Sequence, residues 1–120
     1  MQRMMCKSKI NKARVTQAEL NYEGSITIDE ALLKAADILP GEKVEVLNLN
    51  NGSRIETYAI TAKANSGVVC LNGPAARSGQ VGDEVIVLAY CYVDDKDAGS
   101  VKMKVVNIDS SNSIKNKVLR

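Results

Sequence analysis

The feature that most limits the fold of this chain is a short internal repeat. "GEKVEVL" begins at Gly41 and "GDEVIVL" begins at Gly82, and the two segments agree at the glycine, an acidic residue, both valines and the leucine. Each follows a segment with helical or turn-like composition, as a repeated structural unit would. Two similar halves in a small β-rich chain predict a barrel with internal pseudo-symmetry, because closing the sheet also removes its exposed edges.

Other strand signals agree with a barrel. "VEVLNL" at residues 44–49 and "RIETYAIT" at residues 54–61 flank Asn51 and Gly52, a dipeptide typical of a β-hairpin turn. Three further β-branched or alternating runs are "GVVCLNG", "DEVIVLAYCYV" and "SVKMKVVNID". We therefore predict an all-β chain, mainly strands with one or two short helices, and the length indicates a single domain over residues 1–120.

One helix is expected over residues 29–39, "DEALLKAADIL". Asp29 can cap its first turn, and Pro40 followed by Gly41 would end it. The apolar face of this helix would consist of Leu32, Ala35, Ala36 and Leu39.

Two further segments have weaker patterns. A short helical turn is expected in "GPAARSG" at residues 73–79. The last residues, about 110–120, read "SSNSIKNKVLR" after Asp109 and have little apolar periodicity. We expect them to form a loose tail.

Composition excludes several classes of partner. The chain has 16 basic and 14 acidic residues, a formal net charge of +2, so neither nucleic acid nor a membrane is expected as a partner. It has no Trp and no Phe, so it lacks the aromatic platform on which single strands stack. No stretch resembles a signal peptide or a transmembrane helix, and we expect a cytoplasmic location.

The cysteines and the absence of histidine narrow the chemistry. Cys6, Cys70 and Cys91 are widely spaced, and no His is present to complete a zinc site. We expect no metal site and three reduced thiols. Without His, a Ser/His or Cys/His nucleophile pair cannot form within this chain.

Against this background the pair Gly24 and Ser25 is the most informative short motif. Alone, it is best interpreted as a turn before a capped helix. Four segments in one order change that interpretation: "KSKINKARVT", "YEGSITID", "NGSRIETYAI" and "NGPAARSGQVGDEVIVLAY". With them, the chain resembles the pyruvoyl-dependent aspartate 1-decarboxylases from about Met4 to Asp95.

The resemblance implies a fold, an assembly and an activity. Members of that family are six-stranded double-psi β-barrels that form homotetramers. They convert L-aspartate to β-alanine and CO2 for the synthesis of pantothenate and coenzyme A. Some of them need an activator protein for their maturation, which is a further partner that the resemblance implies.

The resemblance also implies that the chain cuts itself between Gly24 and Ser25, giving a small chain 1–24 and a large chain 25–120. Ser25 would attack the carbonyl of Gly24, where the absence of a Cβ permits a close approach. Elimination and loss of ammonia would then leave a pyruvoyl group at position 25, a covalent cofactor that forms a Schiff base with the substrate. By the family pattern, Thr57 stabilises the oxyanion during cleavage and later contacts substrate.

The family pattern assigns two further roles. Tyr58 is implied as the proton donor after decarboxylation. Arg54 and Lys9 are implied as the substrate clamp. Tight binding of the carboxylate that leaves would slow the reaction, so we expect Arg54, assisted by Lys9, to hold the side-chain carboxylate of aspartate. Thr57 and Tyr58 face opposite sides of a regular strand, so a shared pocket would require an irregular backbone or a subunit boundary.

The remaining expected site residues lie near the cleavage point. The loop Asn72, Gly73, Pro74 and Ala75 is implied to contact substrate. Tyr22 is expected either to line the pocket or to hydrogen-bond the new Gly24 carboxylate. The chain departs from many relatives in having Asn11 where they have histidine and Pro74 where they have alanine, which removes a backbone donor.

Simpler interpretations remain for single residues. Thr57 and Tyr58 could be ordinary strand residues, and Lys9 could be a solvated member of a basic N-terminal arm. For the whole chain, the alternative to an enzyme is a small barrel that only binds a partner, as an adaptor or a transcriptional switch does.

Overall fold

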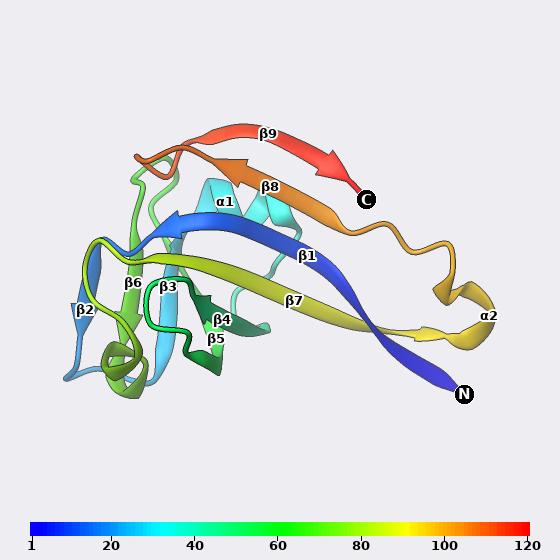
Figure 1. Ribbon diagram of the computed structural model, residues 1–120, viewed down its shortest axis with the longest axis horizontal. Coiled ribbons are helices and arrows are strands. Elements are labelled where there is room, and N and C mark those ends of the chain that lie inside the picture. The colour runs from blue at the N-terminus through cyan, green and yellow to red at the C-terminus, as the bar shows by residue number, and fades with distance from the viewer.

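The predicted hairpin forms the centre of the structure. In the computed structural model, which describes residues 1–120, β4 (Lys43–Asn48) pairs antiparallel with β5 (Arg54–Ala62), and Gly52 has a φ of +76° in the loop between them. The other strands are β1 (Gln2–Arg14), β2 (Gln17–Glu19), β3 (Ser25–Asp29), β6 (Val69–Asn72), β7 (Glu84–Asp94), β8 (Lys104–Ile108) and β9 (Ile114–Leu119). The helices are α1 (Glu30–Ala36), the 3₁₀ helix η1 (Gly73–Ser78) and α2 (Asp95–Ala98) (Figure 1).

Six strands form a closed ring. The strand order is β2-β6-β3-β5-β4-β7-β1-β8-β9, and only Val15 and Thr16 separate β1 from β2. Those two residues continue the pairing, since Val15 N–H donates to Asp83 O at 2.9 Å and Thr16 N–H donates to Val69 O at 2.8 Å. One continuous segment therefore pairs with β7 through β1 and with β6 through β2. The ring agrees with the predicted six-stranded barrel, and β8 and β9 extend it outside β1.

The sequence repeat lies at the pseudo-symmetric centre of this ring. β4 and β7 carry the two copies and pair antiparallel, with Val46 directly opposite its counterpart Val87. Gly41 and Gly82 precede the two strands with φ angles of +86° and +95°, a conformation that favours glycine. The two copies of the repeat are therefore related by a local pseudo-two-fold arrangement of β4 and β7.

Alternate residues of the ring strands point into a single core. Burying each Ile, Leu or Val side chain contributes about 1.5–3 kcal/mol. The inward residues include Ile10, Ile26, Ile28, Val44, Val46, Ala59, Val69, Leu71, Val85 and Val87. The residues between them, Ser25 and Tyr58 among them, point away from the core.

Helix α1 begins as expected and ends earlier than expected. The Asp29 carboxylate accepts a hydrogen bond from Ala31 N–H at 2.8 Å, the usual N-cap contact. The helix ends at Asp37, which has a left-handed φ of +58°, so Pro40 and Gly41 lie beyond its end. The predicted apolar face was wrong at Leu39, which is 67% exposed, while Leu33 is buried.

The prediction of a loose tail at residues 110–120 was also wrong. Residues 114–119 form β9 and pair antiparallel with β8, although all six side chains are exposed. Asn112 anchors the preceding turn, because its side chain accepts from Arg14 N–H at 2.8 Å and donates to Arg14 O at 2.9 Å. Backbone pairing, rather than burial, orders this segment.

Three smaller observations complete the fold. The helical turn expected at residues 73–79 is η1. The long strand β1 and the helix α2 were not predicted. None of the helices combines the length and the apolar character that a membrane-spanning helix needs.

Candidate active site

The Gly24–Ser25 junction is buried and tightly held. Ser25 is the first residue of β3 and is 0% exposed. Its hydroxyl donates to Glu23 O at 3.0 Å and accepts from Asn72 Nδ2 at 3.0 Å. The bond to Glu23 spans Gly24, so the hydroxyl is folded back over the peptide unit that the family pattern marks for cleavage.

Gly73 brings the following loop against this junction. Its φ is +61°, and a Cβ there would lie 2.5 Å from Tyr22 O and 2.9 Å from Gly24 N. Only glycine allows so close an approach. On the other side, a Cβ on Gly24 would lie 3.3 Å from Pro74 Cδ. The two glycines therefore let the 20–24 segment and the start of η1 pack backbone to backbone.

A pocket of about 370 Å³ opens beside the junction. Its lining residues are Gly24, Ile55, Glu56, Thr57, Tyr58, Pro74, Ala75 and Ser78. β3 pairs with β5 only from Ile26, opposite Ala59, onward, so the preceding edge of β5 has no strand beside it there. The pocket lies along that free edge.

This position explains how two adjacent residues share one pocket. Thr57 and Tyr58 point to opposite sides of β5, yet both border its free edge. No register shift interrupts the pairing of β4 with β5, so the irregular backbone that we considered is not needed. The Tyr58 hydroxyl donates to Glu23 Oε2 at 3.5 Å, which keeps the phenol beside the cleavage segment.

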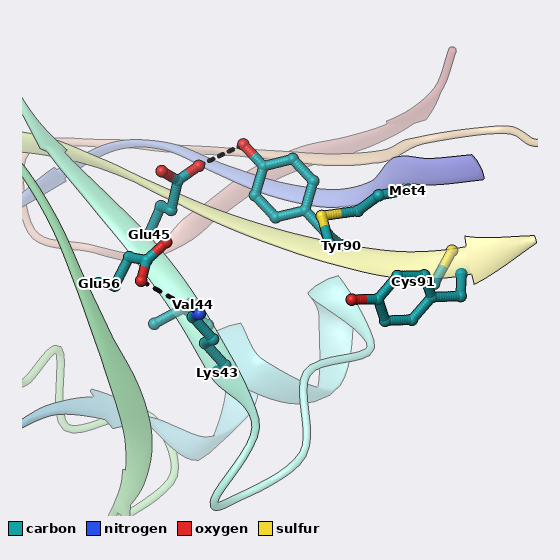
Figure 2. A pocket seen from close by; sticks show the side chains of 8 residues that line it. Met4, Lys43, Val44, Glu45, Glu56, Tyr90 and Cys91 are labelled. Carbon is teal, nitrogen blue, oxygen red and sulfur yellow. Dashed lines mark hydrogen bonds and ion pairs between the residues drawn. The ribbon is translucent and has the colours of Figure 1, made fainter. Parts of the chain in front are cut away.

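Arg54 lies in a different environment. Its Nη1 donates to Glu45 Oε1 at 3.1 Å, and its side chain is 54% exposed. Glu45 also accepts from the Tyr90 hydroxyl (Figure 2). The second pocket, about 330 Å³, is lined by Met4, Lys43, Val44, Glu45, Glu56, Tyr90, Cys91 and Tyr92.

The Glu45–Tyr90 contact changes the acidity of both groups. The hydrogen bonds from Tyr90 and from Arg54 lower the pKa of the Glu45 carboxyl. The same bond, together with burial, raises the pKa of Tyr90 to about 12. Glu45 is therefore an ionised partner that holds Arg54 at the outer face of the barrel.

Neither Arg54 nor Lys9 lines the Ser25 pocket within one chain. Arg54 directly precedes Ile55, which does line it, but side chains alternate along β5 and Arg54 pairs with Glu45 on the other side of the strand. Lys9 lies opposite Leu88 of β7, and Leu88 lies opposite Glu45 of β4. Lys9 and Glu45 thus share a row across the sheet, so the two clamp residues lie on the side of the second pocket.

The other expected residues take varied positions. Asn72 and Ala75 are buried beside the junction, while the Tyr22 side chain is mostly exposed and its backbone carbonyl makes the close contact with Gly73. Pro74 lies in the first turn of η1, where a missing N–H is tolerated. Asn11 donates to Asn107 Oδ1 at 3.0 Å, so its amide holds β1 to β8.

The sequence did not single out Thr27, Cys70, Glu45 or Tyr90 as site residues. Thr27 and Cys70 alternate with Ser25 and Asn72 along their strands, and this period of two was their only signal. The partnership of Glu45 with Tyr90 joins strands 45 residues apart and had no local signal. All three cysteines are free thiols.

Comparison with known proteins places this geometry in a family. The model of the family described as aspartate decarboxylase matches residues 1–115. The aspartate 1-decarboxylase of Thermoanaerobacter pseudethanolicus is 56% identical over 93% of this chain and 96% of its own length. That of Syntrophus aciditrophicus is 56% identical over 96% of this chain and 99% of its own.

Among solved structures, the crystal structure of the rationally designed mkDPBB_sym_86 protein aligns with 64% of this chain and 90% of its own. The sequence identity is 20% and the TM-score is 0.49, so this likeness has no bearing on function. The family model and the relatives cover nearly the whole chain, including the Ser25 junction and both pockets. The chain belongs to the aspartate decarboxylase family.

Proposed function

We propose that this protein is a pyruvoyl-dependent enzyme that decarboxylates L-aspartate at C1 to give β-alanine and CO2, for pantothenate and coenzyme A synthesis. The observation that carries the proposal is the buried Ser25 hydroxyl, folded over the Gly24 peptide at the edge of a pocket lined by Thr57 and Tyr58. The names of the relatives supply the substrate.

Self-cleavage would precede catalysis. The Ser25 oxygen bonds to the Gly24 carbonyl carbon, the bond to the Ser25 nitrogen breaks, and the hydroxyl proton passes to that nitrogen. Loss of the Ser25 Cα proton then expels Gly24 as a carboxylate, and water replaces the nitrogen as ammonia. Thr57 lines the pocket beside Gly24 and is the proposed donor to the oxyanion.

The residues around position 25 fit the cleavage that would form a pyruvoyl group. Asn72 Nδ2, a buried amide donor, lies 3.0 Å from the Ser25 oxygen, which would leave with Gly24, and Gly24 lines the pocket. Once formed, the group supplies a ketone that takes up the substrate amine and accepts the electron pair left by CO2.

Tyr58 returns the proton in this proposal. Its phenol borders the same pocket as Gly24, so it can donate a proton to the carbon that has lost CO2. The loop from Asn72 to Ala75 would hold the substrate against this face, with Tyr22 at the rim.

Arg54 and Lys9 would bind the side-chain carboxylate of aspartate. Because one chain holds them on the side of the second pocket, the proposal needs a neighbouring copy to supply them. A homotetramer provides such neighbours, and the exposed Arg54 is available to one. An activator of maturation and a cytoplasmic location stay predictions.

The activity is tested by incubating the purified full chain with L-aspartate and measuring β-alanine and CO2. Ser25→Ala is the control, because it keeps the fold and removes the only atom that can start cleavage. We expect β-alanine from the unmodified chain and none from Ser25→Ala. Equal β-alanine from both proteins would refute the role of Ser25, and none from either, with cell extract added as a source of an activator, would refute the activity.

A further inference from the structure

Ser25, Thr27, Cys70 and Asn72 form a polar quartet, and the reaction outlined above gives no role to Thr27 or Cys70. In the antiparallel pair of β3 and β6, Ser25 lies opposite Asn72, and Thr27 lies opposite Cys70. Side chains alternate along a strand, so these four share one face of the pair. The opposite face consists of the core residues Ile26, Ile28, Val69 and Leu71.

Hydrogen bonds connect the quartet in one direction. The Cys70 thiol donates to Asn72 Oδ1 at 3.1 Å. Asn72 Nδ2 then donates to Thr27 Oγ1 at 2.7 Å and to Ser25 Oγ at 3.0 Å. Both ends of the amide are thus occupied, and the end that faces Ser25 is the donor.

The orientation of the Asn72 amide has chemical consequences at Ser25. With the amide turned over, Oδ1 would face the two hydroxyls and repel negative charge on the Ser25 oxygen. With Nδ2 in place, an N–H points at that oxygen. The thiol of Cys70 favours the orientation in which Nδ2 faces Ser25. It gives Oδ1 a hydrogen-bond donor at a buried position where water cannot replace it.

Cys70 is suited to remain that donor. It is 5% exposed, and Asn72 is 3% exposed. Burial raises the pKa of the Cys70 thiol, and the nearby Glu19 charge acts in the same direction. The thiol therefore keeps its proton at neutral pH.

We propose that Cys70 and Thr27 are positioning residues for self-cleavage, and that they hold the Asn72 amide as a donor to the Ser25 oxygen. The inference rests on the proposed function. The Ser25 oxygen gains electron density when its proton leaves, and again when its bond to Cβ breaks and the electron pair stays on the oxygen. An N–H already aimed at it stabilises both steps without reorganisation.

The test measures how fast the full chain is cut after synthesis at low temperature, by intact mass of samples taken over time. Cys70→Val removes the donor and leaves an apolar side chain about one methyl group larger, and we expect cleavage about three- to tenfold slower, the effect of one buried hydrogen bond. Cys70→Ser restores a donor and should cut within about twofold of the unmodified rate. Cys6→Ala removes a thiol of β1 that lies outside the quartet and outside the lining of both pockets, and it should leave the rate unchanged.

Thr27→Val gives a second measurement that does not depend on Cys70, and we expect it to slow cleavage as well. Unmodified rates in both Cys70→Val and Thr27→Val would overturn the inference. Equal slowing by Cys70→Val and Cys70→Ser would also overturn it, because a packing effect alone would then suffice. An unmodified chain that is never cut would refute the proposed self-cleavage itself, and the inference with it.

Discussion

The two pockets of this barrel differ in how complete they are. Around Gly24 and Ser25, one chain supplies a buried hydroxyl, a donor amide and a loop that only glycine at position 73 allows. Around Arg54, one chain supplies an exposed guanidinium whose charge is already paired with Glu45. Under the proposed function, the contrast predicts that one chain supplies the residues for cleavage at Ser25, whereas binding of aspartate would draw on a neighbouring copy.

Among variants that still cleave, Tyr58→Phe should cause the largest fall in the rate of decarboxylation. Because Tyr58 would act after CO2 has left, its removal should not affect formation of the 25–120 chain. We expect decarboxylation to fall by about 10²–10⁴-fold, the usual contribution of a positioned acid. The measurement is β-alanine production per cleaved chain, and full turnover by Tyr58→Phe would exclude it as the proton donor.

Gly73→Ala tests the tight packing beside the Gly24–Ser25 pocket. A Cβ at this position would lie 2.5 Å from Tyr22 O on a residue with a φ of +61°, so the loop must move. We expect the free energy of unfolding to fall by roughly 2–3 kcal/mol and cleavage to slow. Gly99→Ala is the matched control, because no atom lies within 4 Å of a Cβ there. Equal denaturation midpoints for the two variants would contradict the tight packing.

Arg54→Ala tests the incomplete pocket. The variant should cut itself at the normal rate, and its KM for aspartate should rise by about 10–100-fold with the loss of a charged hydrogen bond. A second experiment mixes the Arg54→Ala protein with the Tyr58→Phe protein and measures the decarboxylase activity of the mixture. If neighbouring copies share a site, hybrid assemblies regain part of the activity that each variant lacks. An unchanged KM in Arg54→Ala would remove it from the clamp.

The smallest expected effect is at Tyr90. Its pKa in the folded chain is raised to about 12, chiefly by the bond to Glu45, above the ordinary value of about 10. The stabilisation is therefore complete below pH 10 and is lost as the pH rises toward 12, since the unfolded chain loses the proton first. Tyr90→Phe should show a shallower decline of unfolding free energy over this range. Identical slopes for Tyr90→Phe and the unmodified chain would contradict the Glu45 contact.

Local signals predicted the parts of the fold that depend on neighbouring residues. Asn51 and Gly52 indicated the hairpin, and Asp29 indicated the start of α1, because turn and cap chemistry act over a few residues. The end of α1 was misplaced because Asp37 can adopt the left-handed conformation before Pro40 is reached. β9 was missed because its partner β8, not its own polar sequence, determines its structure.

The candidate site divides in the same way. The motif around Ser25 was visible because its residues are close in sequence. Thr57 and Tyr58, which the resemblance assigned to the site, line the pocket beside Gly24, and their roles stay predictions. Cys70 and Thr27 become visible only once β3 and β6 are aligned in register. The pairing of Arg54 with Glu45 likewise depends on tertiary structure.

The central claim is that this chain cuts itself between Gly24 and Ser25 and turns the serine into a pyruvoyl group. Intact-mass analysis of the purified protein tests it most directly. The account predicts a fragment of residues 1–24 and a fragment of residues 25–120 whose N-terminus is blocked to sequential degradation. A single uncut chain after prolonged warming, even with cell extract added as a source of an activator, would contradict it.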